Sequence, residues 1–474
     1  MTGRIETDLC VIGAGSGGLS VAAGAARMGA DTVLIEKAGM GGDCLNYGCV
    51  PSKALIAAAR AAHAVRHAGR FGIAAREPEV DFGGVNRHVR DVIDAIAPVD
   101  SQERFEGLGV RVIRAHARFT GPDTVRAGDV EVKARRFVIA TGSTASAPPI
   151  PGLETVPYLT NETIFGLTAA PSHLIVIGGG PIGIELAQAH RRLGCRVTVL
   201  EKETILPKDD PELAAVIRAS LEADGVKIRE KAQIAGIEPE GDGVAIILRA
   251  GAGAERLAAS HLLVATGRKP VLDGLDLEKA GVRRTDKGLT VDSRLRTTNR
   301  RVYGVGDVVG GYQFTHMAGY HAGIVIRNVL FRLPAKVDAT AMPWVTYADP
   351  ELAQVGLTEA EARERRPDIR VLRWPFADND RARTERDTAG LVKLVTTPRG
   401  RILGAGIAGP HAGEQIHLWT LAVGRKMKVG AIAGMIAPYP TLGEAGKRAA
   451  GDFYTPTLFS DRTRKLVRLL LKLP

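Results

Sequence analysis

Two of the four cysteines in this chain, Cys44 and Cys49, stand five positions apart. In a regular α-helix their Cα atoms would lie about 8–9 Å apart, whereas a disulfide requires about 4.4–6.8 Å. The pair can form a disulfide only if the backbone between them leaves the helix, and Asn46 and Gly48 suit such a break. Two thiols that open and close a disulfide carry two electrons.

The residues after Cys49 predict a helix that begins close to it. Pro51 fits the first turn, and apolar helix formers follow at positions 54–57. A helix N-terminus favours a thiolate, so Cys49 is predicted to be acidic and Cys44 to lie further out on the loop. Lys53 falls one helical turn beyond Cys49, on the same face. The alternative, two unpaired structural cysteines, leaves Pro51, Lys53 and the flanking glycines unexplained.

A complete dinucleotide-binding pattern precedes the cysteines. A buried strand at residues 9–12 leads into a Gly-x-Gly-x-x-Gly loop, an Ala-rich helix and a second strand that ends in Glu36. Gly13 permits the tight turn, Gly15 lets the backbone approach a pyrophosphate, and Gly18 lets the helix pack on the strand. Glu36 is placed to accept hydrogen bonds from an adenosine ribose.

The pattern occurs a second time, so two dinucleotides are predicted. Gly178, Gly180 and Gly183 repeat the three glycine roles, and Glu201 ends the following strand. A carboxylate at that place binds ribose hydroxyls and repels a 2′-phosphate, which predicts NADH rather than NADPH. Lys202 could pair with such a phosphate, but a solvated surface charge is the simpler interpretation.

These motifs together resemble the class I pyridine nucleotide-disulfide oxidoreductases, which include dihydrolipoamide dehydrogenase, glutathione reductase and mercuric reductase. The resemblance extends from Asp8 to about Thr457. It implies an α/β fold with two Rossmann-like domains and a C-terminal α+β dimerisation domain. The implied parts are an FAD-binding domain with the redox disulfide (1–148), an NAD(P)-binding domain (149–268), a return segment to the FAD domain (269–340), the dimerisation domain (341–458) and a basic amphipathic tail (459–474).

The resemblance also implies roles for the site residues. FAD belongs to the first fingerprint and the nicotinamide nucleotide to the second. Lys53 and Glu185 match a pair beside flavin and nicotinamide, where a lysine stabilises developing negative charge. Reduced flavin would open a Cys44–Cys49 disulfide, with Cys49 facing the flavin and Cys44 exchanging with the acceptor. Further residues that match cofactor contacts are Lys37, Gly42, Asp43, Thr141, Gly142, Gly267 and Asp307.

Near the C-terminus the chain departs from the pattern of the dithiol-handling members. These carry a catalytic histidine, followed by a glutamate, that acts across the dimer. Here Tyr439 stands at the histidine position and Glu444 follows. A phenol with a pKa of about 10 is a poor base near pH 7, so fast dithiol exchange by the usual route is not expected.

The acceptor is therefore left open between a disulfide and a metal–thiolate complex. Mercuric reductases carry tyrosine at the Tyr439 position, and the Asp43-containing loop favours the same branch. However, no cysteine follows Cys195, so the C-terminal cysteine pair that relays mercury is missing. The alternatives are a dihydrolipoamide dehydrogenase, which Glu201 favours, a mercuric reductase without its own relay, and a redox-sensing or membrane-associated electron-transfer flavoprotein.

Composition narrows the remaining possibilities. The chain has 474 residues and a net charge of +11, but the arginines are spread out and no nucleic-acid motif is present. No apolar run approaches the roughly 20 residues of a membrane span, and a strand begins too early for a signal peptide. Few cysteines favour a reducing compartment. The predictions are a cytoplasmic homodimer with a small-molecule acceptor, no nucleic-acid partner and no metal site.

The last residues predict a short amphipathic helix. Leucines 466, 469, 470 and 473 form one stripe, with Lys465, Arg468 and Lys472 beside it. This pattern is typical of a helix that lies weakly on an anionic membrane surface. The alternative is that the stripe packs on the dimerisation domain or on the partner subunit.

Overall fold

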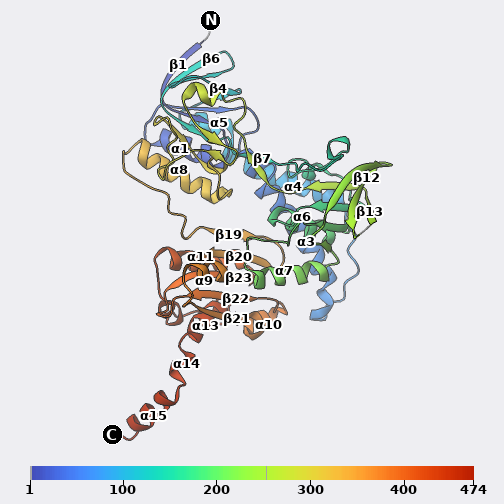
Figure 1. Cartoon of the computed structure of the whole chain (residues 1–474), viewed down its shortest axis with the longest axis vertical. Coiled ribbons are helices and arrows are strands. Elements are labelled where there is room, and N and C mark those ends of the chain that lie inside the picture. Colours follow the sequence, from blue (N-terminus) through green and yellow to red (C-terminus); the bar gives the residue numbers. More distant parts are fainter. Residues whose placement is uncertain (1–2, 252) are drawn as a thin grey trace. The chain divides into compact units, whose positions relative to one another are not determined.

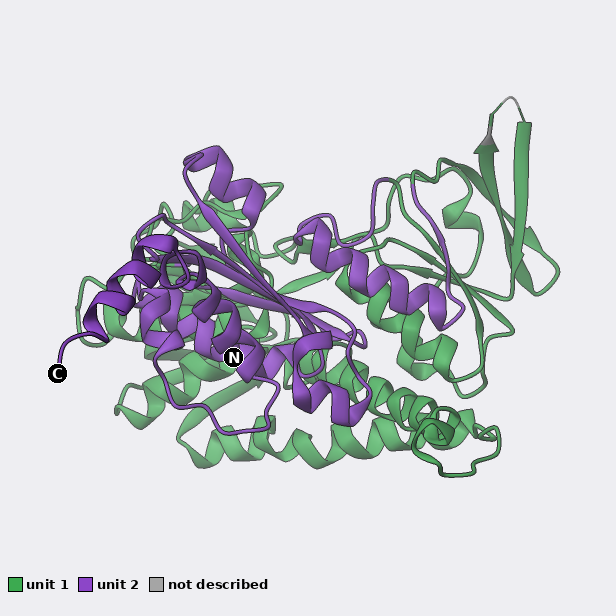
Figure 2. Cartoon of the chain, turned by 90° about the horizontal axis from the view of Figure 1, so that it is seen from below, with its two compact units in different colours: residues 1–202, 231–338 green, residues 203–230, 339–474 purple. Residues whose placement is uncertain are grey.

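The computed structural model describes residues 3–251 and 253–474, which fold into two compact units (Figure 2). Residues 1–202 and 231–338 are assigned to unit 1, and residues 203–230 and 339–474 to unit 2. The segment 203–230 lies inside the NAD(P)-binding domain predicted from the sequence, yet it groups with the C-terminal unit. The predicted domain boundaries remain predictions.

A mixed sheet of seven strands forms the centre of the first part of unit 1 (Figure 1). Its order is β3-β2-β1-β6-β5-β4, and β18 also pairs with β6. The strands are β1 (Gly3–Ile12), β2 (Thr32–Glu36), β3 (Val110–Arg114), β4 (Ala117–Gly121), β5 (Thr124–Ala127), β6 (Val130–Ile139) and β18 (Val302–Gly304). The pairs β1–β2, β2–β3, β1–β6 and β6–β18 are parallel.

Apolar side chains explain why these strands are central. All five residues of β2 are buried, as expected for a parallel strand covered on both faces. Helix α1 (Ser16–Arg27) follows β1 and packs against α8 (Thr315–Val329). Helices α2 (Gly42–Asn46), α3 (Cys49–Arg66), α4 (Phe82–Ile96) and α5 (Gln102–Gly107) complete this part.

The second fingerprint builds a separate parallel sheet in unit 1. Strands β9 (Arg196–Leu200), β8 (His173–Ile177) and β14 (His261–Val264) pair in that order, and α6 (Pro181–Arg192) follows β8. An antiparallel sheet adds β11 (Ile234–Glu240), β12 (Gly243–Ala250) and β13 (Gly253–Ala259). Two Ala-Thr-Gly segments, residues 140–142 and 265–267, are called the crossovers here. They continue into the crossover strands β7 (Ser143–Ala145) and β15 (Arg268–Pro270), which pair with each other.

Unit 2 is an antiparallel sheet with helices, so the predicted α+β domain is confirmed. The sheet order is β19-β20-β23-β22-β21. Its strands are β19 (Pro343–Thr346), β20 (Glu351–Gly356), β21 (Arg370–Pro375), β22 (Leu391–Thr396) and β23 (Ile402–Gly409). The helices are α7 (Pro211–Ala223), α9 (Glu359–Arg365), α10 (Asp380–Glu385), α11 (Ala412–Gly424), α12 (Val429–Ala433), α13 (Glu444–Asp452), α14 (Thr455–Leu458) and α15 (Asp461–Leu470).

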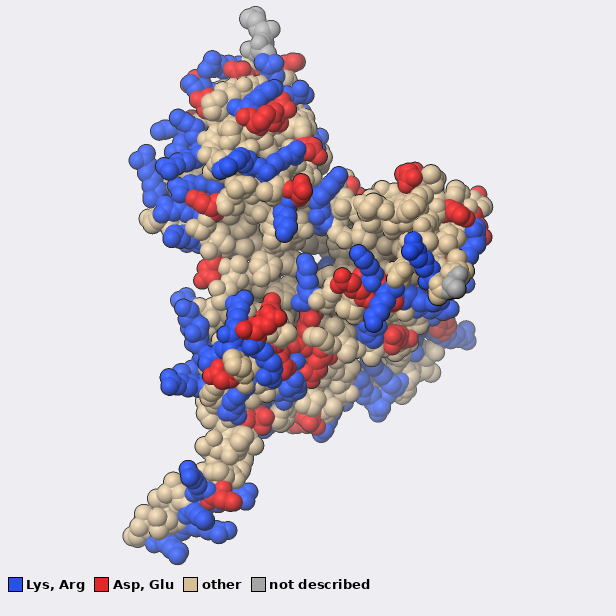
Figure 3. Space-filling model, viewed as in Figure 1, with Lys and Arg blue, Asp and Glu red and all other residues tan. Residues whose placement is uncertain are grey.

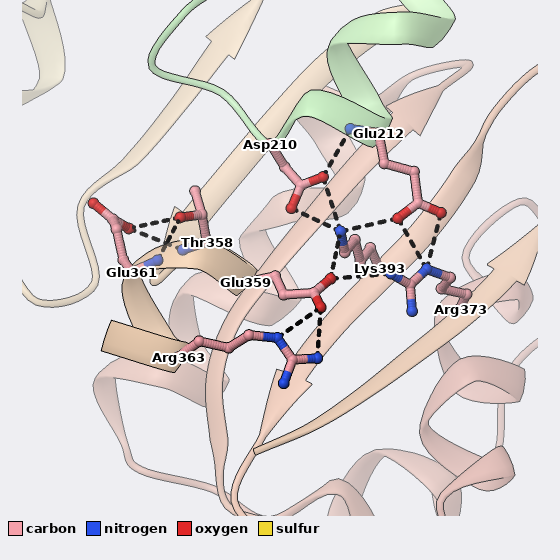
Figure 4. A network of polar contacts seen from close by, with 8 residues as sticks. All are labelled: Asp210, Glu212, Thr358, Glu359, Glu361, Arg363, Arg373 and Lys393. Carbon is pink, nitrogen blue, oxygen red and sulfur yellow. Dashed lines mark hydrogen bonds and ion pairs between the residues drawn. The ribbon is translucent and has the colours of Figure 1, made fainter. Parts of the chain in front are cut away.

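A buried lysine joins α7 to this sheet (Figure 4). The Lys393 side chain, on β22, is only 6% exposed, and its Nζ lies 2.8 Å from Asp210 Oδ2 and 2.9 Å from the nearest oxygens of Glu212 and Glu359. Asp210 also caps α7, since its Oδ1 accepts a hydrogen bond from the Glu212 amide. Arg373 Nε lies 2.9 Å from Glu212 and adds positive charge at the rim. Three carboxylates are thereby held by one buried ammonium group.

Replacing Lys393 with methionine is expected to lower the free energy of unfolding by about 3–5 kcal/mol, because it leaves the buried Asp210 carboxylate without its cation. The loss should appear in urea unfolding followed by circular dichroism, with the exposed Arg399→Gln as a control of unchanged stability.

Although burial raises the pKa of Glu359, hydrogen bonds from Lys393 and Arg363 lower it to about 2. This stabilisation is complete above the ordinary pKa of 4.5 and is lost as the pH falls toward 2. The gap between wild type and variant should therefore shrink on acidification; an equal gap at every pH would contradict the role given to Lys393.

Candidate active site

The predicted helix break between the two cysteines is confirmed. Helix α2 ends at Asn46 and α3 begins at Cys49, so Tyr47 and Gly48 separate the five-residue α2 from the 18-residue α3. The Asn46 amide donates hydrogen bonds to the carbonyl oxygens of Met40 (3.0 Å) and Gly42 (2.8 Å), which fixes the loop. Both cysteines are free thiols in this structure, so the pair is described in its reduced form.

The two thiols are chemically unequal. A hydrogen bond with Cys44 is the largest cause that lowers the pKa of Cys49 to about 6, against the opposing effect of burial. Thr315, the first residue of α8, adds a contact of 3.4 Å from its Oγ1 to Cys49 Sγ, and the Lys53 charge lowers the pKa further. The same hydrogen bond, together with burial, raises the pKa of Cys44. The hydrogen bond between the two thiols thus favours the thiolate form of Cys49 and the protonated form of Cys44.

Lys53 and Glu185 form the ion pair that the resemblance implies. Lys53 Nζ lies 2.7 Å from Glu185 Oε2. The Glu185 side chain is 6% exposed, and that of Lys53 is 36% exposed. The pair joins α3 to α6, so it links the helix that carries Cys49 to the helix of the second fingerprint.

A polar cluster surrounds Asp43, beside the first cysteine. Asp43 Oδ1 lies 3.0 Å from Arg268 Nη2 and accepts a hydrogen bond of 3.1 Å from Asn161. Arg268 also donates to Ser143 Oγ (2.7 Å), and this hydroxyl donates to Asp307 Oδ2 (2.5 Å). Burial raises the pKa of Asp307. The cluster connects the cysteine loop, strands β7 and β15, and Asp307.

Four of these residues had no predicted role, namely Asn161, Ser143, Arg268 and Thr315. Ser143 and Arg268 directly follow the two Ala-Thr-Gly motifs, which is the signal that could have identified them. Thr315 begins a helix eight positions after Asp307, but only the fold brings it to Cys49.

The first fingerprint has the shape that a dinucleotide requires. A Cβ at Gly13 would collide with the Ala140 carbonyl, and a Cβ at Gly18 with the Gly13 carbonyl. These two glycines are thus required by the protein itself. A Cβ at Gly15 would meet nothing closer than 3.9 Å, so its lack of a side chain fits the close approach of a ligand's pyrophosphate. Gly42, with a φ of +61°, comes too close to Gly15 to carry a side chain.

The second fingerprint repeats this arrangement. A Cβ at Gly178 would collide with the Ala265 carbonyl, and a Cβ at Gly183 with the Gly178 carbonyl. A Cβ at Gly180 would meet no heavy atom within 4 Å. The open space lies at the N-terminus of α6, where backbone N–H groups favour phosphate. The residues present therefore fit two bound dinucleotides.

Each fingerprint has a carboxylate that holds its glycine loop. Glu36 accepts hydrogen bonds of 2.6 Å from the amides of Ala14 and Ala38. Glu201 Oε2 accepts a hydrogen bond of 2.6 Å from the Gly179 amide. Both acids stand at the ends of their second strands, as the ribose-binding pattern requires.

Other predicted cofactor residues lie at the crossovers and on the surface. Thr141 Oγ1 donates to the Val271 carbonyl (2.6 Å), which ties the first crossover to the second. Gly142 and Gly267 adopt positive φ values of 70° and 145°, and neither would place a Cβ within 4 Å of another atom. Lys37 and Lys202 are exposed.

In unit 2, Tyr439 and Glu444 have separate partners. Tyr439 is 69% exposed, and its hydroxyl donates a hydrogen bond of 3.1 Å to Asp380 Oδ2. This hydrogen bond raises the pKa of Tyr439. Glu444 accepts hydrogen bonds from Arg448 Nε (3.1 Å) and Nη2 (2.9 Å). Glu444 thus supports α13 through Arg448, and the Tyr439 hydroxyl gives up its proton even less readily than an ordinary phenol.

Comparisons with known proteins agree with this geometry. Residues 7–322 match the sequence profile described as pyridine nucleotide-disulphide oxidoreductase, and residues 342–450 match the dimerisation domain of the same class. A mercuric reductase from Streptomyces lividans is 37% identical over 454 residues, which cover 94% of this chain and 96% of the relative. A dihydrolipoyl dehydrogenase from Geobacillus stearothermophilus is 36% identical over 453 residues, with the same two coverages.

A solved structure of a flavoprotein disulfide reductase is also similar to this chain. The HOCl-induced flavoprotein disulfide reductase RclA from Escherichia coli superposes with a TM-score of 0.84 at 28% identity. The match covers 94% of this chain and 99% of that one.

Proposed function

This chain belongs to the pyridine nucleotide-disulphide oxidoreductase family, and on that premise we propose that it is an FAD-dependent reductase that transfers two electrons from NADH, through the Cys44–Cys49 pair, to a disulfide or metal–thiolate acceptor. The observation that carries this proposal is the unequal thiol pair at the start of α3. Cys49 has a pKa of about 6, while Cys44 keeps its proton. The match to a dimerisation domain supports a homodimer.

Bound FAD would supply the redox chemistry that links the nicotinamide to the cysteine disulfide, namely uptake of a hydride and release of two electrons. Gly13, Gly15, Gly18 and Glu36 would hold it, with Asp307 accepting a hydrogen bond. The nicotinamide nucleotide would occupy the second fingerprint. With a disulfide acceptor, one NADH, one proton and one disulfide give NAD⁺ and two thiols. With a divalent metal–dithiolate acceptor, one NADH and one proton give NAD⁺, the metal reduced by two electrons and two released thiols.

The residues of this chain divide the remaining work. Lys53 supplies a positive charge, and Glu185 holds it in place. Cys49 carries the thiolate, which the adjacent Thr315 hydroxyl stabilises. Cys44 is the thiol that attacks the acceptor after it gives up its proton. Arg268 compensates the Asp43 charge, which by itself raises the pKa of Cys49.

The acceptor is proposed to be a metal–thiolate complex rather than dihydrolipoamide or lipoamide. Relatives named mercuric reductase and dihydrolipoyl dehydrogenase are about equally similar, so similarity alone does not choose between them. Position 439 carries a tyrosine instead of a side chain that can accept a proton near neutral pH. This favours an acceptor whose reduction needs no proton transfer to or from that position. The small number of cysteines predicts a reducing, cytoplasmic location, and reduction of a metal–thiolate complex by a dithiol suits a reducing compartment.

A panel of acceptors tests the proposal. NADH oxidation by the FAD-loaded protein should be followed with glutathione disulfide, lipoamide, Hg(II)–thiol and Cu(II)–thiol complexes, since solved RclA structures include Cu(II) complexes. The proposal predicts the highest kcat/KM with a metal–thiol complex. Equal rates with wild type and with a Cys44→Ser, Cys49→Ser double variant would overturn it.

Glu201 is expected to make NADH the better donor. In Glu201→Ala, kcat/KM for NADH divided by kcat/KM for NADPH should fall about tenfold or more. The reason is that the site loses a carboxylate that pairs with ribose hydroxyls and repels a 2′-phosphate. Lys202→Ala is the matched control and should leave the NADH value unchanged. A wild type that uses both donors equally would show that Glu201 does not set the preference.

A further inference from the structure

Helix α15 extends from unit 2 as a separate element (Figure 1). Ser460 caps it, since its Oγ accepts a hydrogen bond of 3.3 Å from the Thr463 amide. The Thr463 hydroxyl donates to the Thr457 carbonyl (2.8 Å), which fixes α15 to α14. The match to the dimerisation-domain profile ends at residue 450. Helix α15 therefore lies outside the matched region.

One face of α15 is apolar and faces solvent. Leu466, Leu469 and Leu470 are 53%, 61% and 52% exposed, and Val467 adjoins them. Leu471 and Leu473 extend the apolar surface beyond the helix, and both are exposed. The alternative that this stripe packs on the dimerisation domain of its own chain is therefore wrong for the described structure. Packing on the partner subunit stays a prediction. An isolated helix of ten residues is marginal in water, so this face requires a partner.

The opposite face is basic (Figure 3). Arg464, Lys465 and Arg468 fall within about 100° of one another on the helix, roughly opposite Leu466 and Leu470. Residues 459–474 contain five bases and one acid, Asp461. Exposed Phe459 stands just before the helix. Leucines on one side, bases on the other and an aromatic residue at the end are typical of a helix in the plane of a lipid interface.

We propose that α15 binds the surface of an anionic bilayer, with its leucines among the acyl chains and its bases at the lipid phosphates. A second copy of the tail fits less well, because two segments of the same positive charge would repel. A nucleic acid would leave the leucines in water. Among the described residues, none of the helices has the length and apolar character of a membrane span. The two tails of a dimer would act together and strengthen binding.

Vesicle flotation of the FAD-loaded full-length protein tests this proposal. The vesicles contain either phosphatidylglycerol mixed with phosphatidylcholine, or phosphatidylcholine alone, at low and high salt. Binding is expected only to the anionic vesicles, and it should weaken with salt. Leu466→Gln with Leu470→Gln should reduce binding about tenfold per leucine. Lys465→Gln with Arg468→Gln should reduce it about fivefold per base.

The matched control is Arg365→Gln with Arg399→Gln, which removes the same charge from exposed positions of unit 2 and should leave binding unchanged. FAD content and acceptor reduction in solution report whether each variant is folded, and they are independent of lipid. The proposal is overturned if the control loses binding as strongly as the tail variants, or if a chain ending at Ser460 floats as well as the full chain. It is equally overturned if the leucine variants change the oligomeric state but not flotation, or if the tail binds duplex DNA in preference to vesicles.

Discussion

Cys49→Ser is expected to lower turnover with a disulfide or metal–thiolate acceptor by about 10⁴-fold or more, because the nucleophile and its partner act as one unit. Reduction of bound flavin by NADH should continue, since the second fingerprint and the Lys53–Glu185 pair are intact. Anaerobic stopped-flow absorbance separates the two steps. The long-wavelength charge-transfer absorbance of a Cys49 thiolate beside bound flavin should be missing in this variant.

Cys44→Ala is the matched variant that distinguishes the two thiols. It should be equally inactive with the acceptor but should keep a reactive Cys49. The hydrogen bond from Cys44 is the main cause of the low pKa of Cys49, so that pKa should rise from about 6 toward 9.0. In wild type the thiolate is formed as the pH rises through 6; in the variant it should form at higher pH. Alkylation rates measured against pH would show this shift, and an unchanged profile would contradict the assigned hydrogen bond.

Local patterns allowed much of this site to be predicted from the sequence. The loops at Gly13 and Gly178 are specified by backbone collisions with the next parallel strand, which demand glycine wherever this turn is built. The helix break between Cys44 and Cys49 follows from the distance that a disulfide spans. Such features depend on a few neighbouring residues, and a sequence contains them directly.

Apart from the Lys53–Glu185 pair, which the family resemblance implied, contacts between distant segments were not predicted. Thr315 reaches Cys49 from 266 positions away, and Lys393 holds Asp210 from 183 positions away. Nothing in the local sequence around Asp210 indicates that α7 belongs with the C-terminal sheet. These pairings depend on how complete elements pack, and a motif does not encode that packing. The tail was predicted as a helix, but its exposure became known only from the structure.

Tyr439→His is expected to raise turnover with dihydrolipoamide, by up to about 10²–10⁴-fold, which is the usual contribution of a general base. The wild-type phenol has a pKa above its ordinary 10.0, because it donates a hydrogen bond to Asp380. An imidazole titrates near neutral pH and can accept a thiol proton there. In the dithiol-handling members that this chain resembles, a glutamate follows this histidine in the same motif. Here Arg448 holds Glu444, so the single variant should give only part of the gain.

A second substitution tests that reason. Arg448→Ala releases Glu444, so the Tyr439→His, Arg448→Ala double variant should exceed the single variant, whereas Arg448→Ala alone should gain nothing. Tyr439→Phe is the matched control and should react with dihydrolipoamide as slowly as wild type, because the phenol does no proton transfer in that reaction. The measurement is the rate of NAD⁺ reduction by dihydrolipoamide as a function of pH. In the histidine variants this rate should increase as the pH rises through about 6.5, where an imidazole loses its proton. Wild-type turnover that falls sharply in Tyr439→Phe would show that the phenol does act on dithiols, and the dihydrolipoamide dehydrogenase alternative would then replace the metal–thiolate reductase.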